Sequence, residues 1–246
     1  MLPEERLESI VRIVNEYQSI TTQELAELTD SSLSTIRRDV TALAAKGRLL
    51  KIHGGAMSVT ASGINTDSLV AERRTLNAEA KQRIAAYAAG LIRPGDLVYI
   101  DAGTTTEFLI DFITEKDAVY VTNAVSHAAR LVAKGMQVHV VGGMLKPVTE
   151  AVIGSEAVVS LRRFNFSLGF FGANGVSAEA GITTPDINEA VVKQQAVESC
   201  NRCYVLADSS KLGKVSSVRF AEADDVIIIT EKENAAVKGC ATEVAT

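Results

Sequence analysis

Positive charge is concentrated in one short stretch near the amino end of the chain. Between Ser34 and His53 there are five Lys or Arg residues and a single acid, Asp39, whereas the whole 246-residue chain carries a net charge of −5. Such a concentration of cations in an acidic protein is typical of a surface that binds phosphate backbones. The chemistry that this stretch indicates is recognition of a nucleic acid.

The apolar residues of the same stretch predict the element that would present these cations. Ile36, Val40 and Leu43 have the spacing of one buried helical stripe, which places Arg37 and Arg38 on the solvent side. We therefore expect a short helix with an apolar inner face and a basic outer face.

The expected ends of this helix also fit. Ser32 or Ser34 can cap its first turn, and Gly47 can end it in the left-handed conformation that glycine adopts without strain. Residues 48–53 then alternate between apolar and basic side chains, as in a short strand, and a turn is expected at residues 54–55. This is the pattern of a helix followed by a wing.

Two further helices are predicted before the basic one. Residues 4–17 carry an apolar stripe, and Thr21 and Glu24 have the spacing of a capping box at the start of a second helix. Residues 29–31 would form the turn of a helix-turn-helix, whose second helix enters the major groove. The residues expected on the buried stripes of these two helices are Leu7, Ile10, Val11, Val14, Tyr17, Leu25 and Leu28.

We expect double-stranded operator DNA to be the partner of this region. Arg can donate two hydrogen bonds to guanine, and Ser or Thr can contact base edges or phosphates. The competing interpretation is that Arg37 and Arg38 only solvate an ordinary helix; the caps, the apolar spacing and the basic wing together favour DNA. The candidate DNA-binding residues are Thr22, Ser34, Thr35, Arg37, Arg38, Thr41, Arg48, Lys51 and His53.

The composition indicates a protein with an aliphatic core and no membrane anchor. Hydrophobic residues make up 47% of the chain, aromatic residues only 5%, and there is no Trp. No apolar run approaches the ~20 residues that a transmembrane helix needs, and the first residues do not resemble a signal peptide. We therefore expect a cytoplasmic protein.

The three cysteines do not predict a metal or redox site. Cys200 and Cys203 have a C-x-x-C spacing, but zinc needs four ligands and no second Cys or His pair lies at a suitable distance in the sequence. A redox pair would be expected at the start of a helix after a strand, whereas this pair lies where a helix is expected to end. We expect ordinary thiols, one of them buried, and no cofactor.

The chain is expected to contain two domains joined by a linker. Residues 1–57 would form the winged helix-turn-helix, residues 58–75 have the small polar composition of a linker, and residues 76–246 would form an α/β domain. A helix is expected over 77–92, and the tail after Glu231 is left unassigned.

Strands and helices alternate after residue 92, which predicts a mostly parallel sheet. The continuous apolar run at 226–229 indicates a sheet that is buried on both faces. The expected strands are 97–101, 118–122, 137–142, 167–172, 203–207 and 225–230, and the expected helices are 106–115, 124–134, 150–163 and 186–199.

The first expected strand ends in a sequence that suits a phosphate. Asp101 is followed by Ala-Gly-Thr-Thr-Thr106, after which a helix is predicted. A glycine and hydroxyl side chains at a helix start offer free N–H groups, side-chain donors and the positive end of the helix dipole. Since ligands of open α/β sheets bind beyond the carboxyl ends of the strands, a site is expected here.

The other strand ends are also small and polar, and together they predict a pocket for an anion and a polyol. Each feature alone has an ordinary explanation: a cap, a tight turn, or, for Glu189 and Lys193, a surface pair one turn apart. In combination, amide and carboxylate groups can bind sugar hydroxyls and lysines can neutralise a phosphate. The candidate effector-binding residues are Asp101, Gly103, Thr104, Thr105, Thr106, Thr122, Asn123, Gly142, Gly143, Lys146, Gly172, Asn174, Gly175, Glu189, Lys193, Asp208 and Lys211.

These motifs resemble those of the DeoR family of bacterial transcriptional regulators. The resemblance lies in Ser34-Thr-Ile-Arg-Arg-Asp39, in the His-Gly-Gly-Ala segment at 53–56, and in the strand-end segments named above. It implies an N-terminal winged helix-turn-helix and a C-terminal sensor domain that is similar in fold to ribose-5-phosphate isomerase and responds to a phosphorylated sugar. Residues 191–211 most resemble repressors of fructose-utilisation operons, which implies an effector such as fructose 1-phosphate.

We therefore expect a homo-oligomeric repressor, a dimer or a tetramer, that a sugar phosphate releases from DNA. Two alternatives remain: a sugar-phosphate isomerase that carries a DNA-binding domain, and an interaction module whose winged helix binds protein. The isomerases that the sequence resembles have an acidic residue where this chain has Asn174. Because an amide cannot accept a proton as a general base, binding without turnover is favoured.

Overall fold

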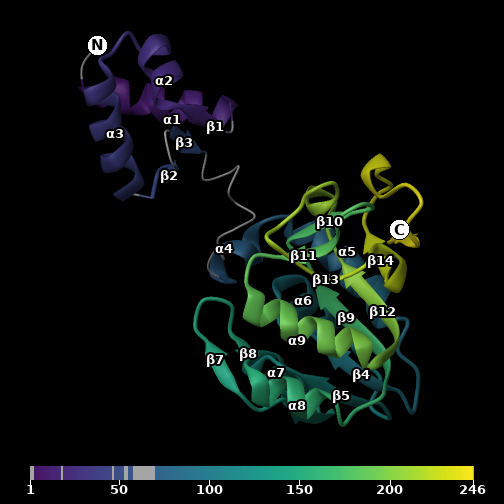
Figure 1. Cartoon of the computed structure of the whole chain (residues 1–246). Coiled ribbons are helices and arrows are strands. Elements are labelled where there is room, and N and C mark those ends of the chain that lie inside the picture. Colours follow the sequence, from purple (N-terminus) through teal and green to yellow (C-terminus); the bar gives the residue numbers. More distant parts are fainter. Residues whose placement is uncertain (1–2, 18, 46, 53–54, 58–69, 246) are drawn as a thin grey trace. The chain divides into compact units, whose positions relative to one another are not determined.

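The chain forms two compact units, Met1–Thr66 and Asp67–Thr246. The computed structural model in Figure 1 describes residues 3–17, 19–45, 47–52, 55–57 and 70–245. Within these ranges no helix has both the length and the apolar character needed to cross a membrane.

The amino-terminal unit contains three helices and a small antiparallel sheet. Its core brings together the predicted stripe of the basic helix, Ile36, Val40 and Leu43, with Ile10 and Leu25 from the preceding helices, all of them buried. In the sheet, β3 lies between β1 and β2, so the wing formed by β2 and β3 is extended by a third strand. The elements are α1 (Pro3–Tyr17), β1 (Ser19–Thr21), α2 (Thr22–Leu28), α3 (Leu33–Ala45), β2 (Leu50–Ile52) and β3 (Gly55–Met57).

The predicted caps of this unit are confirmed. The hydroxyl of Thr21 accepts a hydrogen bond from the Glu24 N–H at 3.2 Å, and the Glu24 carboxylate accepts one from the Thr21 N–H at 2.9 Å. Ser32 Oγ accepts from the N–H of Thr35 at 3.3 Å in the first turn of α3. After α3, Gly47 adopts a φ of +66°, a left-handed conformation that other residues reach only with strain.

Two residues predicted on buried stripes are instead exposed. Tyr17 is 56% exposed and Leu28 is 52% exposed. Each is the last residue of its helix, α1 and α2 respectively, so the stripe has no following turn that would continue it against the core. The strand Ser19–Thr21 between these helices was not expected, because three residues are too few to show a period.

The carboxy-terminal unit is built on a seven-stranded sheet in which all neighbouring strands are parallel. The strand order is β15-β14-β12-β9-β4-β5-β6, so the first strand of the unit, β4, lies inside the sheet. The strands are β4 (Leu97–Ile100), β5 (Val119–Thr122), β6 (Gln137–Val140), β9 (Phe166–Gly172), β12 (Cys200–Leu206), β14 (Ile227–Thr230) and β15 (Thr242–Val244).

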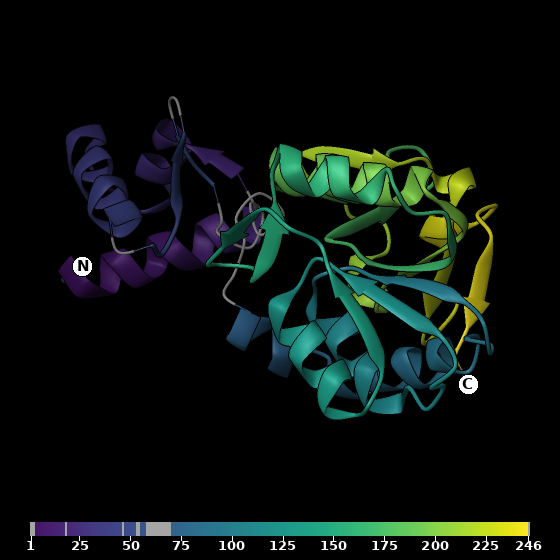
Figure 2. The ribbon, with the colours of Figure 1, turned by 90° about the horizontal axis from the view of Figure 1, so that it is seen from below.

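Helices cover both faces of this sheet, as Figure 2 shows for the green α9 on one side and the blue and teal helices on the other. Along β4, Val98 and Ile100 pack in the cluster that holds α5, α6 and α7, whereas Tyr99 packs in the cluster that holds α8 and α9. This alternation follows from the period of two of a strand. The helices are α4 (Val70–Thr75), α5 (Ala78–Ala89), α6 (Thr104–Phe112), α7 (Val125–Ala133), α8 (Ser155–Leu161) and α9 (Ile187–Glu198).

The predicted helix over 150–163 is wrong in its first half. Residues there form β8 (Ala151–Ile153), which pairs with β7 (Met144–Lys146) in an antiparallel hairpin, and α8 begins only at Ser155. Gly154 has a φ of +101° and separates the two elements, which the continuous apolar spacing of the segment did not reveal.

Three other segments differ from expectation. Residues 70–75, the last part of the predicted linker, form the helix α4. The tail that was left unassigned contains β15, which pairs with β14 and is the edge strand of the large sheet. A second, antiparallel sheet was also not expected, since its strands are short and separated in sequence. It consists of β10 (Gly175–Ser177), β11 (Gly181–Thr184) and β13 (Val218–Ala221).

Buried aromatic side chains of the large sheet contribute to the free energy of unfolding of this unit. Phe170 is fully buried and stacks on Tyr204 with 5.6 Å between ring centroids. Phe170→Ala is expected to lower the free energy of unfolding of this unit by about 3–5 kcal/mol through lost contacts and an unfilled cavity. Phe112→Ala removes the same side chain at a position that is 40% exposed and should cost far less. Urea unfolding followed by circular dichroism compares the two; equal losses would contradict this account of the core.

Candidate functional site

Helix α3 presents its two arginines to solvent. Arg37 and Arg38 are exposed, and within the described ranges neither guanidinium has a hydrogen-bond or ion-pair partner. Thr41 Oγ1 donates to the carbonyl of Arg37 at 2.7 Å and accepts from Lys51 Nζ at 3.0 Å. Since Lys51 belongs to β2, this contact joins the wing to the basic face of α3 and brings three of the candidate residues together.

The start of α3 carries a small cluster of hydroxyl groups. Ser32 Oγ lies 2.9 Å from both Ser34 Oγ and Thr35 Oγ1. Ser34 is exposed and Thr35 is partly buried, as is Thr22 at the start of α2. Such hydroxyls at helix starts are positioned to donate to phosphate oxygens.

Two other charges near α3 are neutralised within the unit. Asp39, the single acid of the basic stretch, is buried and accepts from Arg6 Nε at 2.7 Å. Arg48 donates two hydrogen bonds of 2.9 Å to Glu8, and this pairing lowers the pKa of the Glu8 carboxyl. Arg48 therefore has an internal partner with which DNA would have to compete. The candidate His53 lies outside the described residues.

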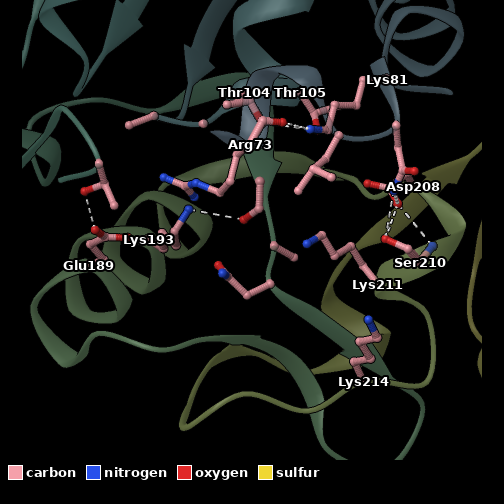
Figure 3. Close-up of a pocket in the computed structure, with 18 residues that line it drawn as sticks. Arg73, Lys81, Thr104, Thr105, Glu189, Lys193, Asp208, Ser210, Lys211 and Lys214 are labelled. Atoms are coloured by element: carbon pink, nitrogen blue, oxygen red, sulfur yellow. Dashed lines mark hydrogen bonds between the residues drawn. The ribbon is translucent and has the colours of Figure 1, made fainter. Parts of the chain in front are cut away.

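The carboxy-terminal unit contains a cavity of about 270 Å³ beyond the carboxyl ends of β4, β9 and β12. This is the edge of the sheet at which the sequence pattern predicts a ligand-binding site. Nine of the predicted effector-binding residues line it, several of them labelled in Figure 3. They are Gly103, Thr104, Thr105, Gly172, Asn174, Glu189, Lys193, Asp208 and Lys211.

Four further predicted residues lie behind the lining and hold its loops. The fully buried carboxylate of Asp101 accepts from the N–H of Gly172 at 3.0 Å and from Lys193. Asn123 accepts from the N–H of Ala102 at 2.8 Å. The other two residues are threonines. Thr106 Oγ1 donates to the Gly103 carbonyl at 2.9 Å, and Thr122 Oγ1 accepts from the Ala124 N–H at 3.1 Å.

The last four predicted residues also lie outside the lining. Lys146 on β7 forms ion pairs with Asp186 at 3.1 Å and with Glu189 at 3.0 Å, and Glu189 is a residue of the lining. Gly142 and Gly143 lead into the β7–β8 hairpin. Gly175 is in β10, where a Cβ would lie 2.5 Å from the Lys214 carbonyl oxygen.

Sequence reasoning missed six polar or charged residues of the lining. Lys81 carried a signal that could have found it, because it stands one turn before Ile84 and Ala85 on the buried stripe of α5 and is itself buried. The others come from the segment interpreted as a linker and from loops whose folding brings them to the cavity. The six residues are Arg73, Asn77, Lys81, Thr149, Ser210 and Lys214.

The cavity is electropositive. Five cationic side chains line it against two carboxylates, and the start of α6, where no side chain caps the helix, faces it. Burial lowers the pKa of Lys81 to about 8, and burial also lowers the pKa of Lys211, because both ammonium groups have lost water. A cavity of this kind favours an anion. The five cations are Arg73, Lys81, Lys193, Lys211 and Lys214.

The two carboxylates are held in fixed orientations. Glu189 Oε1 accepts from Lys146 Nζ at 3.0 Å and from Thr149 Oγ1 at 2.5 Å. Asp208 Oδ1 accepts from Asn77 Nδ2 at 2.9 Å and from the N–H of Ser210 at 3.1 Å. Fixed carboxylates on the wall of an anion site are suited to accept hydrogen bonds from hydroxyl groups of the same ligand.

The cysteines form no disulfide in the structure, and Cys203 is buried, as expected for one of the thiols. The strand that contains them begins at Cys200 rather than at Cys203. Among the residues described, no group of three or more His, Cys, Asp or Glu side chains is arranged to hold a metal ion.

Family comparisons cover both units. The model of the DeoR-like helix-turn-helix domain matches residues 6–62, and that of the DeoR C-terminal sensor domain matches residues 76–232.

The chain belongs to the DeoR family.

Curated relatives align along almost the whole chain. The HTH-type transcriptional regulator FruR of Bacillus subtilis, itself described as uncharacterized, is 42% identical over 94% of this chain and 91% of its own length. GlpR of Haloferax volcanii is 34% identical, again over 94% and 91%. The lactose phosphotransferase system repressor of Staphylococcus aureus is 33% identical over 92% and 90%. The resemblance to DeoR regulators seen in the motifs is thereby confirmed.

Solved structures with a related arrangement include ribose 5-phosphate isomerase A from Methanocaldococcus jannaschii, with a TM-score of 0.41, 15% identity, and coverage of 56% of this chain and 57% of that one. The sorbitol operon regulator SorC from Klebsiella pneumoniae gives a TM-score of 0.39 and 9% identity over 83% and 88%. The expected fold class, a winged helix-turn-helix followed by a mostly parallel α/β sensor domain, is confirmed, and the large sheet is wholly parallel.

The lowered pKa of Lys81 predicts how anion binding by this DeoR-family sensor domain depends on pH. Above pH 8 the ammonium loses its proton, so the affinity for inorganic phosphate should fall as pH rises from 7.5 to 9. The neighbouring charges are Asp208, which favours the ammonium, and Lys211 and Arg73, which disfavour it.

Isothermal calorimetry at several pH values measures this dependence. Lys81→Arg keeps a permanent cation and should flatten the fall in phosphate affinity, leaving only the contribution of Lys211. An unchanged slope in Lys81→Arg would show that the titration of Lys81 does not govern binding.

Proposed function

We propose that this protein is a DNA-binding repressor of a carbohydrate-utilisation operon, and that a phosphorylated sugar releases it from its operator. The observation that carries the proposal is a strongly cationic cavity at the strand ends, in the same chain as a helix that exposes Arg37 and Arg38. Residues 1–57 would bind DNA, and residues 76–246 would bind the effector and assemble subunits. The place of action would be the cytoplasm, where operator and sugar phosphate meet.

The winged helix-turn-helix would place α3 in the major groove. Arg37 and Arg38 would contact guanine edges or phosphates, while Thr41 and Lys51 would approach the backbone next to them. Because the buried Asp39 is paired with Arg6, it does not offset the positive charge of this face. One such helix binds weakly, so a dimer or tetramer that presents several helices to repeated half-sites would provide the affinity.

The effector would be a sugar phosphate, for which the two kinds of lining group are suited. Its phosphate would bind at the start of α6, near Thr104 and Thr105 and within reach of Lys211. Its hydroxyls would bind to the fixed carboxylates and to Asn174. Two relatives are named as a lactose phosphotransferase system repressor and as FruR, which supports a sugar effector, and we propose fructose 1-phosphate as the first candidate.

Release of DNA requires that the sugar phosphate bind two states of the oligomer unequally. We propose that the liganded sensor domain favours a state in which the spacing of the recognition helices no longer fits the operator. The acidic remainder of the chain would at the same time weaken contact with unrelated DNA.

The isomerase alternative is disfavoured by the chemistry of the cavity. Asn174 lies in the lining, where an amide can bind a hydroxyl but cannot accept a proton as a general base. We propose that the sensor domain binds a sugar phosphate without converting it.

A mobility-shift assay with operator DNA separates the alternatives. Titration with fructose 1-phosphate, fructose 6-phosphate and the corresponding free sugars should release DNA only with a phosphorylated sugar. Conversion of the sugar into its isomer would identify an enzyme instead. DNA that is never shifted would identify an interaction module.

Arg38→Ala is expected to weaken operator binding by about 1–3 kcal/mol and to reduce the slope of log affinity against log salt by about 1, because one cation is lost from the DNA surface. Arg12→Ala, which removes an exposed arginine of α1, is the matched control. Fluorescence anisotropy at several salt concentrations measures both. If Arg38→Ala binds as tightly as the parent protein, α3 is not the recognition helix.

Thr105→Ala and Lys211→Ala are expected to retain operator binding but to need at least about tenfold more sugar phosphate for release, since each removes a donor to the proposed phosphate. Lys116→Ala, at an exposed position outside the cavity, should respond normally. The concentration of sugar phosphate that releases half of the DNA is the quantity to compare. Normal release by both cavity variants would place the effector elsewhere.

A further inference from the structure

One cation of the cavity, the partly buried Arg73, has two buried nitrogen atoms without a partner among the described residues. Arg73 Nε and Nη2 are inaccessible to solvent, and neither has a hydrogen-bond partner in the part of the chain that the structure describes. Figure 3 shows the Arg73 side chain among the lining residues, extending toward the side of the cavity where Lys193 is labelled. Because a guanidinium remains charged and its buried donors are costly when unpaired, the geometry calls for an anionic acceptor.

The groups next to Arg73 reinforce this requirement. Lys81 Nζ donates to the main-chain carbonyl of Arg73 and, at 3.2 Å, to Thr104 Oγ1. The charge of Arg73 also contributes to the lowered pKa values of Lys81 and Lys211, although burial contributes more to both. Three cations thus lie close enough to repel one another around the start of α6.

Arg73 differs from the other cations in the element that carries it. It belongs to α4, which in chain order is the first helix after residues 58–69, the segment that follows the winged helix-turn-helix. Helix α4 also carries the ion pair from Arg74 Nε to Glu107 at 2.7 Å, and the Arg74 side chain is 43% exposed. Ion pairs that are this accessible to water contribute little to stability.

The junction between α4 and α5 is bonded to the lining of the same cavity. Asn77 has a φ of +53°, a left-handed conformation that is uncommon for a residue other than glycine. Its side-chain amide donates to Asp208 at 2.9 Å and to Ser210 Oγ at 3.1 Å, and all three residues line the cavity. The position of α4 is therefore tied to the groups that a ligand would contact.

We infer that the anionic group of the effector is the missing partner of Arg73, and that bound effector fixes α4 against the body of the sensor domain. This inference rests on the proposed function, since it takes the ligand to be a phosphorylated sugar. The phosphate is then held from two sides, by the start of α6 with Lys81 and Lys211, and by α4. Binding of the effector would therefore act on α4, the helix that follows residues 58–69 and the DNA-binding domain in the sequence.

Limited trypsin digestion of the full-length protein tests whether the ligand fixes α4. Trypsin cleaves after Arg73 and Arg74, and a fixed helix resists cleavage. Saturating fructose 1-phosphate, with inorganic phosphate as a simpler probe, should slow cleavage at these two bonds at least fivefold, while cleavage after the exposed Lys116 stays unchanged.

Variants of the two adjacent arginines provide the second measurement. Arg73→Gln should weaken binding of inorganic phosphate and of the sugar phosphate by about 10–100-fold, as expected for the loss of charge-assisted hydrogen bonds. Arg74→Gln, its matched control outside the lining, should change affinity less than threefold. Arg73→Lys keeps the positive charge but lacks the paired N–H donors of a guanidinium, so its affinity should lie between those of Arg73→Gln and Arg74→Gln. Circular dichroism establishes that each variant is folded.

The outcomes separate this inference from the proposed function. If a sugar phosphate raises the melting temperature of both the parent protein and Arg73→Gln to the same extent, or leaves cleavage after Arg73 and Arg74 unprotected, the role of α4 is refuted while the effector site stands. If neither a sugar phosphate nor inorganic phosphate stabilises the parent protein, the proposed function fails, and the inference fails with it.

Discussion

The sensor domain depends on one buried carboxylate at the centre of the sheet. Asp101 directly follows β4, is inaccessible to solvent, and accepts hydrogen bonds from Lys193 of α9 and from the N–H of Gly172 at the end of β9. Burial raises the pKa of this carboxyl, and the nearby ammonium of Lys193 opposes the rise. Since an unpaired charge at this depth would cost several kcal/mol, the strand ends and the helix are held together as one unit.

This arrangement determines where the other charges can act. With Asp101 engaged by Lys193, the loop after β4 is set so that α6 begins at the cavity wall, and its free N–H groups face the same space as Lys81 and Lys211. The cations of the cavity are enclosed, whereas Arg37 and Arg38 of the DNA-binding domain are exposed. An enclosed site selects a small anion of defined shape, and an exposed row of cations suits an extended polyanion.

The sequence alone allowed the strand ends of the cavity to be predicted, because the position of residues such as Thr104 and Asp208 follows from the rule that parallel strands point their carboxyl ends to one edge. It did not reveal Arg73 or Lys81. Arg73 lies in a stretch without period, and its place in the cavity arises from the folding of α4 over the strand ends. The position of Lys81 on the buried stripe of α5 is a signal of burial, but a lysine is ordinarily exposed, and the residue type outweighed the position.

The carboxylates of the cavity also bear on whether this site binds or converts a sugar. A general base must direct a free lone pair at the proton that it removes from the reacting carbon. Glu189 Oε1 is paired with the Lys146 ammonium, and Thr149 Oγ1 donates to the same oxygen, so the lone pairs of this oxygen are already engaged. Asp208 is likewise held through one oxygen by Asn77 and Ser210. Both carboxylates are thus held in orientations that suit them to accept hydrogen bonds from hydroxyl groups of a ligand.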